Sequence, residues 1–251
     1  KMFATKNINL AWNGGDLLSF LPILLTLIFF SLYWFVAHSE KIKSKFYQSN
    51  PSDKDLFNHI FFTKIFGFIS MGIFPLLLCL LVFKDKSIAD FGLSFNQDTL
   101  LFSLSWTLGL SILVIPIAHF SAKKPKNLIN YPQARSKIWS KSMRIKEAFA
   151  WFAYLFGYEL LFRGVLLFPL VEAFGVWPAI AINIALYAAT HIPKGLDETI
   201  GAVPLGLVLC ILTLLSGDIW IAFLVHVAMA WTNTFTALHF HPDMEYEEKI
   251  K

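Results

Sequence analysis

Seven apolar stretches run through this 251-residue chain, and they limit its fold more than any other feature. Each is long enough, or nearly so, to cross the ~30 Å hydrocarbon core of a bilayer, which takes about 20 residues of α-helix. They lie at residues 17–38, 57–83, 97–120, 148–171, 176–192, 199–216 and 218–240. The predicted fold class is therefore all-α, a polytopic membrane helix bundle of about seven transmembrane helices, with six to eight as the range.

Composition agrees with a membrane protein and argues against a nucleic-acid partner. The chain is 56% hydrophobic and only 15% charged, whereas a soluble domain carries about 25% charged residues. Its net charge of +4 comes from basic residues in the loops beside the apolar stretches, where they set topology and meet lipid headgroups. Cys79 and Cys210 lie within apolar stretches and are interpreted as small core residues without a disulfide. Membrane lipid is the expected partner, and nucleic acid is not.

The distribution of Lys and Arg between the loops predicts the orientation. Fifteen basic residues lie on one side: four in 39–56, eight in 121–147, one in 193–198 and two in the tail. The other side has four, namely Lys1, Lys6, Lys84 and Lys86. Because cytoplasmic loops are enriched in Lys and Arg, we expect an integral multi-pass protein with its N-terminus outside and its C-terminus in the cytoplasm.

The basic segment 121–147 divides the chain. Its later part combines positive charge with Ile138, Trp139, Met143 and Ile145, which predicts a short amphipathic helix lying on the cytoplasmic leaflet. We therefore divide the chain into N-terminal helices and a basic loop (1–147), a helical core that holds nearly every intramembrane polar residue (148–240) and a polar tail (241–251).

Two opposite charges lie inside the fourth apolar stretch. Glu159 and Arg163 are four residues apart, so they share one helix face and can partly neutralise each other. Charges at membrane depth are costly and usually functional. The simpler alternative is an ion pair that only helps the helices to pack.

Further polar residues follow helical spacing in the later stretches. Asn183, Tyr187 and His191 are separated by four residues each and line one face, and His226 and Asn233 lie nearly on one face of the last helix. From the rise per residue, Glu159 and His226 both fall near mid-membrane. We expect Glu159, His191 and His226 to converge in a cavity open to the cytoplasmic half.

This set of side chains can perform hydrolysis. A carboxylate in an apolar cavity can take a proton from water, and imidazoles can position that water, stabilise an oxyanion or ligate a metal. Glu159, His191 and His226 form a candidate zinc or other divalent metal site, but the same set also works without metal, so the sequence requires no cofactor. Each histidine alone is more often a packing residue.

The same residues resemble a known family. The CPBP family of intramembrane endopeptidases (CAAX protease and bacteriocin-processing, or Abi) includes the type II CAAX prenyl endopeptidases and carries the motifs Glu-Glu-x-x-x-Arg, Phe-x-x-x-His and His-x-x-x-Asn. Here Tyr158-Glu159-x-x-x-Arg163, Tyr187-x-x-x-His191 and His226-x-x-x-Ala230 resemble them in order, over residues 148–240. The resemblance implies catalytic roles for Glu159, Arg163, His191 and His226, and a membrane-associated peptide or protein substrate.

Two departures from the motifs bear on activity. Tyr158 replaces the first Glu, which is taken as the water-activating base in the family, and Ala230 replaces the Asn. Glu159 matches the second Glu, about 100° further round the helix, so it would need a rotated helix to act as the base. Asn233 lies one turn too deep to replace the motif Asn simply. Tyr158, Asn183, Tyr187 and Asn233 are retained as secondary or substrate-contacting candidates.

Three functions remain open from the sequence. The first is an endopeptidase that cleaves near the cytoplasmic side of the membrane with a water activated by Glu159 and the histidines. The second is a catalytically impaired pseudoprotease that acts as a membrane scaffold or binds a partner. The third is a proton-coupled transporter, which the absence of repeated halves argues against.

Overall fold

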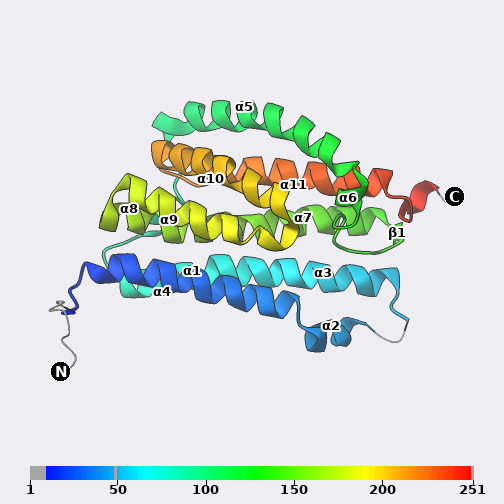
Figure 1. The fold of residues 1–251 in the computed structure, drawn as a ribbon, viewed down its shortest axis with the longest axis horizontal. Coiled ribbons are helices and arrows are strands. Elements are labelled where there is room, and N and C mark those ends of the chain that lie inside the picture. Colours follow the sequence, from blue (N-terminus) through cyan, green and yellow to red (C-terminus); the bar gives the residue numbers. More distant parts are fainter. Residues whose placement is uncertain (1–9, 48–49, 250–251) are drawn as a thin grey trace, which may run out of the picture.

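The computed structural model describes residues 10–47 and 50–249 as a membrane-type helix bundle (Figure 1). Lys1, Lys6 and Lys251, which entered the count of basic residues, lie outside the described residues. Seven helical segments of the described chain are long and apolar enough to cross a membrane: 16–37, 53–82, 97–122, 141–174, 176–194, 196–216 and 220–240. The all-α fold and the seven predicted spans are confirmed.

The first three spans contain four α-helices and one π-helical segment. The first span is α1 (Asp16–Ala37), and the short helix α2 (Glu40–Phe46) follows it. The second combines α3 (Asp53–Gly67), a π-helical segment η1 (Phe68–Ile73) and α4 (Phe74–Val82). The third is α5 (Gln97–Ala122), reached through the 3₁₀ turn Ile88–Phe91.

The last four spans carry the polar residues. The fourth is α7 (Lys141–Glu159), the π-helical segment η3 (Leu160–Leu167) and α8 (Phe168–Phe174). The fifth is α9 (Val176–Ala189), which the 3₁₀ turn Ile192–Lys194 follows. The sixth is α10 (Leu196–Ser216) and the seventh is α11 (Trp220–Phe240). Figure 1 shows α1, α3 and α4 on one side of the α7–α8–α9 layer, with α10, α11 and finally α5 on the other.

The fourth span is the centre of the bundle. Of its most apolar 18-residue window, 78% is buried inside the protein, against 6% for the corresponding window of α5. The packing around it is close because small residues face each other: a Cβ added at Gly72 of η1 would lie 2.8 Å from Gly157 Cα of α7. Small residues allow helix backbones to approach in this way. The contact is at Gly157, two residues before Glu159, so it helps to position the polar centre.

The segment between the third and fourth spans differs from the expected surface helix. It contains a short helix, α6 (Pro125–Leu128), and a strand, β1 (Ile138–Trp139). Strand β1 pairs in parallel with β2 (Glu245–Tyr246) of the tail, which ends in the 3₁₀ turn Glu247–Lys249. Ser140 then caps α7 by accepting a hydrogen bond from Met143 N. Nothing breaks the helix between this cap and the membrane span, so the amphipathic residues after Ser140 form the first turns of α7 and not a helix of their own.

A buried ion pair joins the second and fourth spans. Lys64 of α3 and Glu147 of α7 form a salt bridge with side chains only 2% and 0% exposed, and the ammonium group lies 4.0 Å from the centre of the Trp151 ring. Lys64 lies within the predicted span 57–83, whereas Glu147 is the last residue of the segment 121–147 that the sequence predicted to lie outside the membrane. The two residues are 83 positions apart, and no local spacing relates them.

Candidate functional site

The polar centre begins where the fourth span changes helical form. Helix α7 ends at Glu159, and the next eight residues, which include Arg163, are π-helical. A π-helical segment has more residues per turn than an α-helix, so it changes which side chains share a face, and such segments are frequent at functional sites. Tyr158 and Glu159 both lie in α7, so their side chains still point about 100° apart, whereas the π-helical segment changes where Arg163 lies relative to Glu159.

Glu159 is held by one residue of α11 and one of its own span. Its Oε1 lies 2.5 Å from His226 Nδ1, and its Oε2 lies 3.5 Å from Arg163 Nε. The Glu159 and Arg163 side chains have no exposed surface, and that of His226 is 7% exposed. Since a carboxylate only accepts, His226 donates from Nδ1. The ion pair that the four-residue spacing predicted is present, and His226 joins it from 67 residues away.

Arg163 is further enclosed by polar groups of α9. Its Nη1 donates to Asn183 Oδ1 at 3.3 Å, and its guanidinium carbon lies 4.4 Å from the centre of the Tyr187 ring. Asn183 also donates from Nδ2 to the carbonyl oxygen of Phe162 in the π-helical segment, at 2.6 Å. Cys210 of α10 contacts the same amide oxygen at 3.2 Å. Sequence analysis gave Cys210 only a core role, because nothing in its local sequence indicates this contact.

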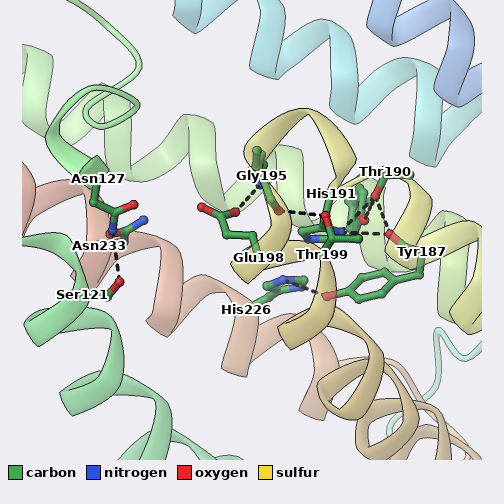
Figure 2. A network of polar contacts seen from close by, with 12 residues as sticks. Ser121, Asn127, Tyr187, Thr190, His191, Gly195, Glu198, Thr199, His226 and Asn233 are labelled. Atoms are coloured by element: carbon green, nitrogen blue, oxygen red, sulfur yellow. Dashed lines mark hydrogen bonds and ion pairs between the residues drawn. The ribbon is translucent and has the colours of Figure 1, made fainter. Parts of the chain in front are cut away.

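Tyr187 connects the two histidines (Figure 2). Its hydroxyl lies 3.4 Å from His226 Nε2, and its backbone oxygen accepts a hydrogen bond from His191 Nδ1 at 3.0 Å. The rings of Tyr187 and His191 are 4.8 Å apart. Because His191 Nδ1 donates to a carbonyl, its Nε2 carries the lone pair in the neutral ring. His191 is half-buried, and among the described residues Nε2 has no hydrogen-bond partner.

Tyr158 lies beside this chain of contacts but does not touch Glu159 through its hydroxyl. That hydroxyl is 2.7 Å from Thr190 Oγ1, and Thr190 donates in turn to the Tyr187 carbonyl, so Tyr158 is the donor to Thr190. The Tyr158 ring lies 6.0 Å from that of His226. Thr190 was not predicted as a site residue, although it directly precedes His191. At the position of the family's first Glu, this chain therefore has Tyr158, whose hydroxyl contacts Thr190 at the end of α9.

Asn233 lies outside the polar centre. Its Oδ1 accepts from Asn127 Nδ2 at 3.2 Å, and Asn127 also contacts Ser121, so the three form a separate group between the end of α5 and α11 (Figure 2). The seven-residue spacing from His226 aligns the two side chains on one face of α11, but the bundle partners differ at their two depths. Asn233 therefore does not replace the motif Asn, and Ala230 offers no polar group in its place.

The three candidate metal ligands do not form a ligand set. Among the described residues, no three His, Cys, Asp or Glu side chains are grouped so that they can hold a metal ion. Neither ring nitrogen of His226 is free to bind a metal, because Nδ1 donates to Glu159 and Nε2 lies 3.4 Å from the Tyr187 hydroxyl. The geometry does not fit the zinc site that the residue types allowed.

A bundle of seven apolar spans with a buried carboxylate, guanidinium and imidazole at its centre defines a polytopic membrane protein with a polar core. Residues 145–232 match the family model described as Rce1-like, type II CAAX prenyl endopeptidase Rce1-like. The match begins in α7, ends in α11 and includes Glu159, Arg163, His191 and His226. It confirms that this part of the chain resembles the CPBP endopeptidases, as the motifs predicted. No curated protein and no solved structure matches the chain.

Proposed function

We propose that this protein is an intramembrane endopeptidase in which His191 activates the water and Glu159 orients His226. The observation that carries the proposal is the direct contact of 2.5 Å between Glu159 of α7 and His226 of α11. A carboxylate that accepts from imidazole Nδ1 orients the ring and stabilises its protonated form, as the acid does in a Ser-His-Asp triad. This assigns Glu159 a different role from that of the water-activating base.

Burial argues against Glu159 as the base. A general base must reach the water that it deprotonates, directly or through one further water. Glu159 has no exposed surface, Oε1 is bound to His226, and Oε2 faces Arg163. His191 is better suited, because it is half-buried and its Nε2 lone pair is unused by the described residues.

The proposed reaction uses three groups of this chain. His191 Nε2 takes a proton from water, and the resulting hydroxide attacks the carbonyl carbon of the scissile peptide. His226, protonated and paired with Glu159, donates from Nε2 to the developing oxyanion. The proton on His191 then passes to the leaving amine. Arg163 offsets the charge of Glu159, so the buried centre carries no net negative charge before substrate binds.

The substrate and orientation are part of the same proposal. His191 lies at the end of α9 and directly precedes the turn Ile192–Lys194, so the cleaved bond lies toward the end of the bundle where loops 39–56 and 121–147 are. We assign that end to the cytoplasm from its excess of basic residues, and the substrate class to membrane-associated peptides or proteins. In intact cells, an impermeant maleimide should label Asp85→Cys on the outer side but not Asp243→Cys on the cytoplasmic side. The native Cys79 and Cys210 should not react, because both are buried. The reverse pattern would invert the assignment.

The contacts of Tyr158 favour a second function, the binding of a membrane partner without cleavage. Tyr158 occupies the position of the family's first Glu, and its hydroxyl is used by Thr190. A protein built in this way could bind a membrane partner without cutting it. The two functions differ in whether any peptide bond is hydrolysed.

The deciding experiment is a cleavage assay in proteoliposomes with a library of membrane-embedded peptides, read by mass spectrometry. For the endopeptidase, His191→Ala and Glu159→Gln should each lower cleavage by about 100-fold or more. His119→Ala is the matched control, because His119 is another intramembrane histidine, bonded to Thr236 and outside the site. Cleavage that survives His191→Ala refutes His191 as the base. If only the variant with both Tyr158→Glu and Ala230→Asn cleaves, the wild-type protein is the binding form.

A further inference from the structure

A cavity lies at the membrane surface where two spans end, away from the polar centre. It has a volume of about 510 Å³ and is lined by α6 and the residues after it, by the loop that carries Arg135 and Lys137, and by the first residues of the tail. Helix α5 ends at Ala122 just before α6, and α11 ends at Phe240 just before the tail. Figure 1 shows α6 beside the terminal part of α11. Because the two spans end beside it, we expect the cavity to lie at the level of the lipid headgroups.

Two cationic side chains of the cavity wall have no ion-pair partner among the described residues, although the Asp53 carboxylate accepts from the backbone N–H of Lys137 at 2.6 Å. Arg135 and Lys137 are exposed, and neither forms an ion pair within the part of the chain that the structure describes. Partial burial lowers the pKa of Arg135, which reflects the cost of this charge without a carboxylate beside it. Asp243 is the one acidic residue of the lining, and it pairs with neither.

Two hydrogen-bond donors face each other in this wall. His241 Nδ1 accepts from the backbone N–H of Asp243 at 3.1 Å, so the proton of the neutral ring is on Nε2. That Nε2 lies 3.4 Å from Arg135 Nη1, which is also a donor and is already anchored on the carbonyl of Leu128 at 3.0 Å. Two donors cannot satisfy each other, whereas one anionic oxygen can accept from both.

The apolar part of the wall points to a lipid. Ile129 is 73% exposed and lies next to the cationic groups in the lining. A free phosphate ion would leave this surface unused, but the glycerol and first acyl carbons of a phospholipid would cover it. Basic pockets at the membrane surface bind anionic headgroups in this way.

We propose that this cavity binds the headgroup of an anionic phospholipid, whose phosphate oxygens accept hydrogen bonds from Arg135 and His241 while Lys137 supplies a second charge. The site is independent of the proposed hydrolysis, since none of its residues belongs to the polar centre. A bound lipid would also join the loop that carries Arg135 to the tail, which meet in the β1–β2 pair.

The test titrates the purified full-length protein with phosphatidylglycerol, or with phosphatidylcholine of the same acyl chains, and counts bound lipid by native mass spectrometry. The wild type should prefer phosphatidylglycerol, and Arg135→Gln with Lys137→Gln should lower that affinity by about 10-fold or more. The control is Lys41→Gln with Lys45→Gln, which removes the same charge from exposed residues of α2 and should change the affinity by less than about twofold.

Three outcomes overturn the proposal. An equal loss in both double variants means diffuse attraction to the basic surface. Equal binding of the two lipids means that the headgroup charge is not recognised. If inorganic phosphate binds as tightly as phosphatidylglycerol and displaces it, the site is for a soluble anion. A melting temperature raised by phosphatidylglycerol in the wild type and in the α2 control, but not in the cavity variant, establishes that the cavity variant is folded and has lost the site.

Discussion

Replacing Arg163 by Leu removes the guanidinium that lies 3.5 Å from Glu159. Three contacts are lost: the ion pair to Glu159 at 3.5 Å, the hydrogen bond to Asn183 at 3.3 Å and the stacking on Tyr187 at 4.4 Å. Removing one member of a buried ion pair costs about 3–5 kcal/mol, because the other charge is left uncompensated. The hydrogen bond from His226 Nδ1 to Glu159 Oε1 remains and offsets part of this. We expect a net loss of about 3 kcal/mol in the free energy of unfolding, at the lower end of that range.

The assay is thermal unfolding of the purified protein in detergent. For a chain of this size, 1 kcal/mol corresponds to a shift of about 2–4 °C, so Arg163→Leu should melt about 6–12 °C below wild type. Adding Glu159→Gln should restore much of the loss, because the uncompensated charge is then gone. Lys86→Leu is the control, because Lys86 pairs with Glu172 at 2.6 Å, but the two side chains are 19% and 49% exposed, and such pairs contribute at most about 1 kcal/mol.

Two outcomes would refute the reasoning. If the melting temperature of Arg163→Leu equals that of the wild type, the guanidinium does not stabilise the buried carboxylate. If the double variant is no more stable than Arg163→Leu alone, the loss comes from Asn183 and Tyr187 and not from the charge of Glu159.

Two further predictions concern the packing of the fourth span. Gly157→Ala should destabilise the protein by about 1–3 kcal/mol, because the new Cβ would lie 2.8 Å from backbone atoms of Phe68, whereas Gly109→Ala has open space around it and should be neutral in the same melting assay. Lys64→Met should lower the melting temperature because Glu147 is left buried and unpaired, and Lys64→Met with Glu147→Leu should be more stable than the single variant. A double variant that melts below Lys64→Met would show that the unpaired Glu147 carboxylate is not the cause of the loss.

Features that depend only on neighbouring residues could be predicted from the sequence. The number of spans follows from the length and hydropathy of each stretch, and these are properties of the local chain. The pairing of Glu159 with Arg163 was expected from their spacing of four, and the two side chains meet at 3.5 Å although Arg163 lies in the π-helical segment. The order of the three motifs was enough to find the family that residues 145–232 match.

Which helix faces meet could not be predicted from local sequence. Helix rotation and depth are set by packing between spans, so the contacts of Glu159 with His226 and of Lys64 with Glu147 have no local signal. The same reason separates Asn233 from the polar centre and brings Thr190 and Cys210 into it. The π-helical segment after Glu159 adds to this, because it changes the register of the face on which the sequence prediction depended. Periodicity predicts which residues share a face, but the surrounding helices determine what that face contacts.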